Sequence, residues 1–390
     1  MRQSFFLALV IFLSSACAAP TPAPAVPPPS TATSGVVTAA GNPTRPPASP
    51  THTRAPVSLL DAATPTATAA PTDTPAPTLT ATPAPAQLSQ LMNGGCCVSP
   101  AWLPDSKSIV FIDKPNADAP VGMYQVNIDA PFSSTLWSER IAFYTSAFDY
   151  AQIPEPAGTR LIRVSDGQEW RIQNGGRTVQ ISPDRTRIVW TETRETFPIE
   201  NRVSNIMLAN LDGSDPKRLL QVLRGGVSGW LDDNRLLVNG RASRDTYAST
   251  LFVYDLRDDS RTEIVQAERL RLTAPSRNGS WIAYAITNDA DAARNGLWVV
   301  RADGSGARKL DFFGPLQWRD ETHFIYVPFE MNASTHAFYE YDVTTGESRR
   351  LTPPDQPFTI ASGDWAVSPD GNKIVFVNAA DNNLWLWQFH

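Results

Sequence analysis

Short apolar runs rich in β-branched and aromatic residues alternate with tight polar turns along most of this chain. Three of the turns contain a Pro-Asp pair: Asp105 in SPAWLPDSKSIVF, Asp184 in ISPDRTRIVW and Asp370 in VSPDGNKIVF. A turn of this composition followed by an apolar β-branched run predicts a strand, a tight turn and a second strand. Degraded copies of the same phrase surround three further residues, Asp233, Asn278 and Asp320.

The turns recur at a nearly constant spacing. From Asp184 onward the copies are 42 to 50 residues apart, and the interval from Asp105 to Asp184 is 79 residues, close to two such steps. Self-similarity at about 40–50 residues, with four strands per unit, is typical of a β-propeller. The pattern therefore predicts an all-β fold built from four-stranded blades.

Each unit also has a recognisable second half, in which two apolar strands meet at an Asp-Gly or similar hairpin turn. Hairpins of this kind are expected at Met123–Trp137, Leu161–Ile172, Ile206–Leu220, Leu251–Val265, Leu297–Leu310 and Phe338–Thr352.

The last unit begins at Trp365 and supplies only three strands. A strand from Gln87–Met92, just before the first unit, would complete it and remove the exposed sheet edges. With this N-terminal strand closing the ring, the count is seven blades. The unit within Ile141–Ile172 lacks a Pro-Asp turn, so six blades is the alternative.

The phrase SPAWLPDSKSIVF, together with the DGS…KRL hairpins, resembles the TolB-like propeller repeat, which is also related to the propeller of prolyl-oligopeptidase-type peptidases. The similarity extends over residues 97–390. It implies the propeller fold. Because the family includes scaffold, binding and enzyme-accessory proteins, the resemblance does not imply one activity.

The first 16 residues predict a lipoprotein signal peptide. Phe5–Leu13 is an apolar core too short to span a bilayer, and small residues then lead into Cys17. Small residues followed by Cys resemble the lipobox of bacterial lipoproteins, which implies acylation of Cys17, although Ser14 stands where that motif usually has Leu. The alternative is an ordinary signal peptide and a free secreted protein.

Residues 17–86 are dominated by Pro, Thr, Ala and Ser, and half of the chain's 34 prolines fall between Pro20 and Pro85. Such a composition buries too little apolar surface to offset its ordering entropy, so we expect a disordered linker. The linker would hold the propeller, residues 87–390, away from a membrane surface.

The net charge of −6, without any basic run, argues against nucleic acid as a partner and against direct adhesion to anionic lipid. After the signal, no apolar stretch approaches the length of a membrane-spanning helix. We therefore expect an exported monomer that is held to the cell envelope by its lipid alone and faces the periplasm or the exterior.

Alternate connections of a propeller blade lie at opposite ends of the ring. The turns between first and second strands, and between third and fourth strands, are short and uniform here, whereas the second-to-third connections are long and unlike one another. Long loops on a rigid scaffold commonly carry binding. We call this the long-loop end and place the candidate binding residues there: Arg194, Glu195, Arg241, Arg244, Tyr247, Asp289, Asp291 and Arg294.

Sequence motifs for catalysis and metal binding are missing. No G-x-S-x-G pentapeptide occurs, and the four histidines show neither H-E-x-x-H nor Cys/His spacing. The sequence therefore predicts no cofactor and no metal. Carboxylates projecting into the central funnel from different blades would offer a route to glycan hydrolysis, which stays as an alternative.

Cys96 and Cys97 leave two interpretations open. Gly94 and Gly95 could relax the backbone enough for a labile disulfide between adjacent residues. Successive strand residues point to opposite faces, however, so the favoured interpretation keeps the two thiols apart and inert.

Together these features predict a lipid-anchored cell-envelope propeller that acts as a non-catalytic scaffold and binds a protein or peptide through its long-loop end. The alternative is an envelope carbohydrate-binding protein or a glycan-processing enzyme that uses funnel carboxylates.

Overall fold

The computed structural model describes residues 87–194, 201–330 and 333–389. These residues belong to one compact unit, Thr78–His390. The predicted signal peptide, Cys17 and the whole linker lie outside the described residues. Among the described residues, no helix has the length and apolar character needed to cross a membrane.

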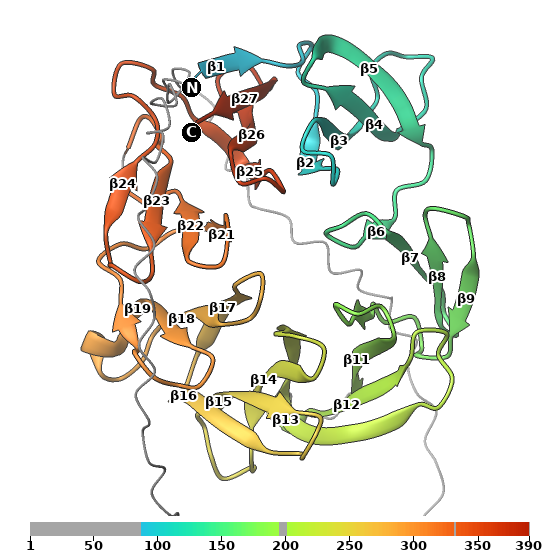
Figure 1. Ribbon diagram of the computed structural model, residues 1–390, viewed down its shortest axis with the longest axis vertical. Helices are drawn as coiled ribbons and strands as arrows, with labels where there is room; N and C mark the ends of the chain where they lie inside the picture. The colour runs from blue at the N-terminus through green and yellow to red at the C-terminus, as the bar shows by residue number, and fades with distance from the viewer. Residues whose placement is uncertain (1–86, 195–200, 331–332, 390) are drawn as a thin grey trace, which may run out of the picture. The chain divides into compact units, whose positions relative to one another are not determined.

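Almost all regular secondary structure in the described chain is β-strand, and the sheets follow one another around a ring in sequence order (Figure 1). Five of the sheets have four antiparallel strands. In each of these, one edge strand faces the centre of the ring and the other faces its outer rim (Figure 1). The predicted all-β propeller arrangement is therefore confirmed. A short 3₁₀ helix, η2 (Ala292–Arg294), lies in one of the connections.

The strands of the five four-stranded sheets, each given from the inner to the outer edge, are β2 (Val98–Trp102), β3 (Ser108–Asp113), β4 (Gly122–Asn127) and β5 (Ala130–Ser138); β6 (Phe143–Tyr144), β7 (Tyr150–Pro154), β8 (Thr159–Arg163) and β9 (Glu169–Ile172); β17 (Leu270–Pro275), β18 (Trp281–Ile286), β19 (Gly296–Arg301) and β20 (Arg308–Lys309); β21 (Leu316–Trp318), β22 (His323–Tyr326), β23 (Tyr339–Asp342) and β24 (Ser348–Arg350); and β25 (Ile360–Val367), β26 (Lys373–Asn378), β27 (Leu384–Gln388) and β1 (Gln87–Gln90).

The ring is closed by the strand predicted for that task. β1 pairs antiparallel with β27, with Gln87 opposite Gln388 and Gln90 opposite Trp385. The backbone N–H of Leu91 continues the ladder by donating to the Leu384 carbonyl at 2.8 Å. The first and last parts of the propeller therefore share one sheet, and the N-terminal strand is confirmed.

The sixth sheet has seven strands, listed here in their order across the sheet: β10 (Gln180–Ile181), β11 (Arg187–Arg194), β12 (Val203–Asn210), β13 (Lys217–Trp230), β14 (Arg235–Arg241), β15 (Ser249–Asp255) and β16 (Arg261–Ala267). β13 has 14 residues; its first part pairs with β12 and its second part with β14. At the crossover an added Cβ on Gly225 would collide with the Asn239 carbonyl, so the close approach requires glycine there.

Buried apolar side chains collect between consecutive sheets. Phe111 and Tyr124 of the β2–β5 sheet pack with Val375 and Leu386 of the closing sheet. Similar clusters join the other neighbouring sheets, with one exception within the described residues: the β2–β5 and β6–β9 sheets share no such cluster. We call the contact region between two neighbouring sheets a seam. At the seam between these two sheets an aromatic contact replaces the cluster, and the ring centres of Trp137 and Tyr144 are 4.9 Å apart.

Tryptophan side chains at the ends of inner strands connect each strand to the preceding inner strand. Nε1 of Trp102 donates to the Ala366 carbonyl at 2.9 Å, and Nε1 of Trp318 donates to the Ala274 carbonyl at 3.0 Å. Trp230 makes the equivalent bond to the beginning of β10, at 3.1 Å. Each bond gives the indole N–H a partner and fixes the spacing of neighbouring inner strands.

The short turns are held by carboxylates that accept backbone N–H groups. Asp105 Oδ1 accepts from the N–H groups of Lys107 and Ser108 at 2.9 and 2.8 Å. In the degraded copy near Asp233 the acceptor is Asp232, one residue earlier than the repeat phrase suggests. The turn geometry is therefore preserved although the sequence phrase has shifted.

The turn around Asn278 is held by a carboxylate of the next sheet. Glu321 accepts hydrogen bonds from the Ser276 hydroxyl at 2.7 Å and from the N–H groups of Asn278 and Ser280 at 2.6 and 3.0 Å. Burial acts to raise the pKa of Glu321, but these hydrogen bonds outweigh burial and lower the pKa below the ordinary glutamate value.

Replacing the Glu321 carboxylate should therefore destabilise the ring. We expect Glu321→Ala to lower the free energy of unfolding by about 1–3 kcal/mol, because three donors lose a charged acceptor. Because the folded-state pKa is depressed, the stabilisation is complete above about pH 5 and fades as the pH falls below about 4. Urea denaturation of both proteins at pH 7 and pH 3.5 measures this. Glu347→Ala, at an exposed turn residue, is the control; an equal effect of both substitutions at pH 7 would contradict the assignment.

Candidate functional site

The structure places most of the candidate binding residues at the long-loop end. Arg241 is the last residue of β14, and Arg244 and Tyr247 belong to the connection between β14 and β15. Asp289, Asp291 and Arg294 belong to the connection between β18 and β19. Arg194 is the exposed last residue of β11, and Glu195 lies outside the described residues.

Two of these candidates, Arg241 and Tyr247, line one cavity of about 550 Å³. The remaining residues of its lining are Arg224, Ser249, Glu268, Arg269, Leu270 and Arg271. We call it the arginine cavity.

Strand geometry brings the arginines together from separate parts of the chain. Arg241 ends β14 and pairs with the β13 residue that precedes Arg224. Arg269 immediately precedes β17, the inner strand of the next sheet, and Arg271 is the second residue of that strand. The register of β17 shifts just after Arg271. Such a bulge changes the direction of neighbouring side chains. The arginine cavity is therefore lined from two neighbouring sheets.

The arginine cavity has an excess of positive charge. Arg241 is only 7% exposed, and its Nε atom is buried without a hydrogen-bond partner. The guanidinium carbon of Arg241 lies 5.6 Å from the centre of the Tyr247 ring, which is a cation–π contact. Within the described part of the chain, none of the four arginines forms an ion pair with a carboxylate.

This arrangement is suited to binding an anion. A buried guanidinium without a partner is unfavourable, and an anionic ligand would supply the missing acceptor. The planar fork of arginine matches a carboxylate or a phosphate through two parallel hydrogen bonds. Glu268 is the one acidic side chain in the lining.

The candidate residues on the β18–β19 connection form contacts that hold this loop in place. Arg294 Nη1 forms an ion pair with Asp289 Oδ2 at 3.2 Å, and Arg294 also donates to the Gln266 carbonyl. Asp291 caps η2 by accepting from the Ala293 N–H at 3.0 Å. These three residues do not line the arginine cavity, and neither do Arg194 and Arg244.

Sequence reasoning did not select Arg224, Glu268, Arg269 and Arg271. A signal for the last two was present, because charged residues alternate with leucine in ERLRL at the beginning of a strand. Arg224 gave no local signal, since only the crossover of β13 brings it beside Arg241.

The inner strands carry very few acids. Within the described inner strands, including the crossover strand β13, Asp364 on β25 is the only carboxylate. Burial raises the pKa of Asp364 above the usual aspartate value, although the N–H of Ser99 donates to it at 3.4 Å. A pair of facing funnel carboxylates, as expected for glycan hydrolysis, is not formed by these strands.

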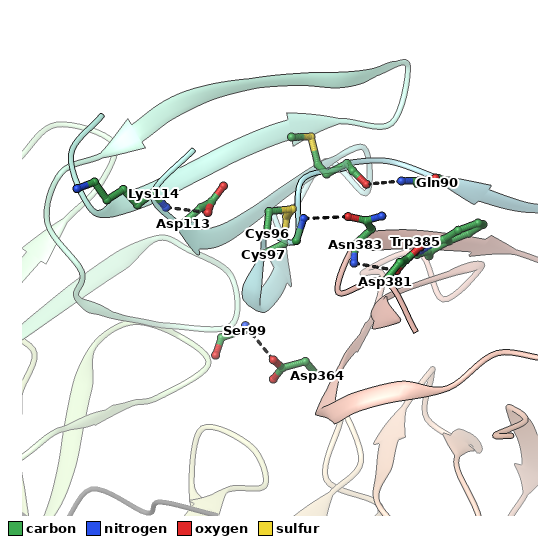
Figure 2. Close-up of a disulfide and its surroundings, with 12 residues drawn as sticks. Gln90, Cys96, Cys97, Ser99, Asp113, Lys114, Asp364, Asp381, Asn383 and Trp385 are labelled. Carbon is green, nitrogen blue, oxygen red and sulfur yellow. Dashed lines mark hydrogen bonds between the residues drawn. A yellow bond between two sulfur atoms is a disulfide. The ribbon is translucent and has the colours of Figure 1, made fainter. Parts of the chain in front are cut away.

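Cys96 and Cys97 form a disulfide in the connection between β1 and β2. The strand alternation that would separate the two thiols does not apply, because both residues precede β2. Figure 2 shows the pair between Asp113 and the turn that contains Asn383.

Comparison with known proteins shows similarity at the level of the fold. No family model and no curated protein matches the chain. An oligogalacturonate lyase in complex with manganese is 12% identical with a TM-score of 0.54, covering 79% of this chain and 98% of that one. The oligogalacturonate lyase of Vibrio parahaemolyticus is 10% identical with a TM-score of 0.54, covering 78% and 96%. A putative TolB from Agrobacterium tumefaciens is 16% identical with a TM-score of 0.40, covering 66% and 94%.

If Arg241 serves to bind a ligand, replacing it should not destabilise the ligand-free protein. We expect Arg241→Met to leave the free energy of unfolding within about 0.5 kcal/mol or to raise it, because an unpaired buried charge is replaced by an apolar side chain. Arg319→Met is the matched comparison, since Arg319 is paired with the buried Glu340, and it should cost about 1–3 kcal/mol. Chemical denaturation in a buffer without carboxylate or phosphate checks both. An equal loss in the two variants would make Arg241 a structural residue.

Proposed function

We propose that this chain is a lipid-anchored propeller of the cell envelope that acts as a non-catalytic scaffold and binds an acidic segment of a protein or peptide at its long-loop end. The observation that carries the proposal is the arginine cavity, in which Arg241 is buried without an ionic partner. An acidic segment would bring the carboxylates that the cavity lacks, and arginine binds carboxylates in a defined geometry.

In this proposal the ring has seven blades and resembles the TolB-like repeat. The seven-stranded sheet supports the count, since β10–β13 and β13–β16 can be read as two blades that share β13. Added to the five four-stranded sheets, they make seven. Reading the seven-stranded sheet as one blade leaves the six-blade alternative.

The anchor rests on the sequence. An apolar signal core followed by small residues and Cys17 supports acylation, and the Pro/Thr-rich residues 17–86 would serve as the spacer between lipid and propeller. A propeller on such a spacer can reach partners in the envelope.

The enzyme alternative has less support. Two oligogalacturonate lyases are similar in fold, and one of them holds manganese. Among the described residues of this chain, the one group of three metal-ligating side chains is Cys96, Cys97 and Asp113, and thiolates are not the ligands that manganese prefers. With Asp364 as the single carboxylate of the described inner strands, binding is favoured over glycan chemistry.

The anchor is tested by replacing the acylated residue. We expect the native protein to fractionate with membranes and to incorporate a labelled fatty acid. The Cys17→Ser protein should incorporate no label, because no thiol is available for acylation. Labelling of Cys17→Ser equal to that of the native protein would contradict the lipid anchor.

The binding function is tested by crosslinking the full-length protein to partners in the envelope of its host. We expect Arg269→Ser/Arg271→Ser to lose capture of the partner and to weaken its affinity at least about tenfold, because hydrogen bonds to charged groups contribute about 1.5–3 kcal/mol each. Arg257→Ser/Arg261→Ser removes the same charge at the β15–β16 hairpin, at the opposite end of the sheet, and is the control.

The outcomes separate the alternatives. Equal capture by both double variants would exclude the arginine cavity as the binding site. Retention of an acidic glycan in place of a protein, with loss in Arg269→Ser/Arg271→Ser, would favour the carbohydrate-binding alternative.

A further inference from the structure

The disulfide between Cys96 and Cys97 joins neighbouring residues at the point where the ring closes. The pair lies in the connection from the closing strand β1 to the inner strand β2, and its Cα atoms are 3.7 Å apart. The Gly95 N–H donates to Asn383 Oδ1 at 3.1 Å, which fixes the segment to the β26–β27 turn (Figure 2). The cystine is therefore positioned by two sheets.

The backbone around the cystine is held in an unusual conformation. Cys97 has a φ of 89°, in the left-handed region that residues with a side chain rarely adopt. Gly94, Gly95 and Ser99 also have positive φ values. Glycine adopts this conformation freely, whereas at Cys97 and Ser99 it persists only because surrounding contacts impose it. Opening the disulfide would relax one of these constraints, which favours reduction.

The two sulfur atoms differ in accessibility. Cys97 is 1% exposed and belongs to the apolar cluster with Leu91 and Trp102, whereas Cys96 is only partly buried. A reductant can therefore approach Cys96, and the Cys97 sulfur is the leaving group.

A carboxylate stands beside the two sulfurs. Asp113 ends β3, and its oxygen lies with both Sγ atoms in a group whose members are all within 4.8 Å of one another. One Asp113 oxygen accepts from the Lys114 N–H at 2.7 Å, which orients the carboxylate (Figure 2). Two thiolates and a carboxylate form a ligand set that favours Zn²⁺ and other thiophilic divalent ions.

We propose that Cys96, Cys97 and Asp113 form a redox-gated binding site for a thiophilic divalent metal ion such as Zn²⁺. The oxidised pair does not bind the ion. Reduction by a small-molecule thiol produces the dithiol, and the ion then binds to two thiolates and one carboxylate, with water completing a tetrahedron.

The reduction balances as an ordinary thiol–disulfide exchange. One thiolate attacks Cys96 Sγ, the bond between the sulfurs breaks, and Cys97 leaves as a thiolate that takes up a proton. A second thiolate attacks the mixed disulfide and releases Cys96. Two external thiols are oxidised to one disulfide, and two electrons reduce the protein sulfurs. Binding of the ion then releases two protons from the dithiol.

Binding of the ion requires the two sulfurs to move apart. Two thiolates on a tetrahedral zinc ion, each about 2.3 Å from the metal, are about 3.8 Å apart. The sulfurs reach this separation only after the disulfide opens, and an Asp113 oxygen already lies within 4.8 Å of both of them. The partly buried Cys96 side chain is the one free to rotate, so the sulfurs can separate while Cys97 stays in the core.

The test uses Co²⁺ as a spectroscopic probe for the zinc site in the full-length chain carrying Cys17→Ser, so that Cys96 and Cys97 are its only cysteines. After reduction and removal of the reductant without oxygen, we expect about one Co²⁺ per chain, with thiolate-to-cobalt charge-transfer absorption and the visible bands of tetrahedral cobalt. Zn²⁺ should displace it. The oxidised protein should show none of these bands.

Two substitutions make the test specific. Cys96→Ser should abolish the charge-transfer bands. Asp113→Asn should weaken Co²⁺ binding at least about tenfold. Asp118→Asn, at an exposed aspartate in the same β3–β4 connection, should leave it unchanged. If reduction unfolds the ring, binding by the flexible dithiol would not distinguish Asp113 from Asp118. Equal binding by these two variants, binding by the oxidised protein, or no binding by the reduced protein would each overturn the proposal.

Discussion

Each sheet of this ring can bury its faces only against its neighbours, so the fold depends on every seam being filled and on the last seam being closed. The pairing of β1 with β27 supplies that closure, and indole hydrogen bonds such as Trp102 to Ala366 set the spacing of adjacent inner strands. Once these contacts are made, the strand ends have fixed positions. The connections at the long-loop end can then vary in sequence without changing the scaffold that carries them.

The sequence predicted the repeat because its turns have a local physical cause. A carboxylate two residues before a backbone N–H makes the same bond wherever it occurs, so Asp105 and its copies recur visibly. Where the bond is made by a residue from elsewhere, prediction fails: Asn278 has no turn carboxylate of its own, and Glu321 reaches it from the next sheet. Whether a carboxylate from another sheet can hold a turn depends on how the two sheets pack, and no local sequence pattern reveals this.

The candidate site illustrates the same limit. Choosing long loops led to Arg241 and Tyr247, which do line the arginine cavity, but also to Asp289 and Arg294, which pair with each other. Five of the eight residues that line the cavity lie on strands and not on loops. Arg224 reaches it only because β13 crosses between two parts of one sheet. Charge patterning along the chain cannot reveal this, since the whole protein is acidic and the positive charge is concentrated by folding.

The seams also differ in strength, and the difference bears on what each site can do. Beside the arginine cavity, Leu251 and Val253 pack against Ile282 and Tyr284 of the next sheet in a continuous buried cluster. The arginines of the cavity therefore lie on a rigid scaffold. This limits the conformational entropy that is lost when a ligand binds. The seam of Trp137 and Tyr144 lacks such a cluster within the described residues, so the ring is least tightly packed there. Because both the arginine cavity and the cystine lie at other seams, local opening of this one would leave their geometry in place.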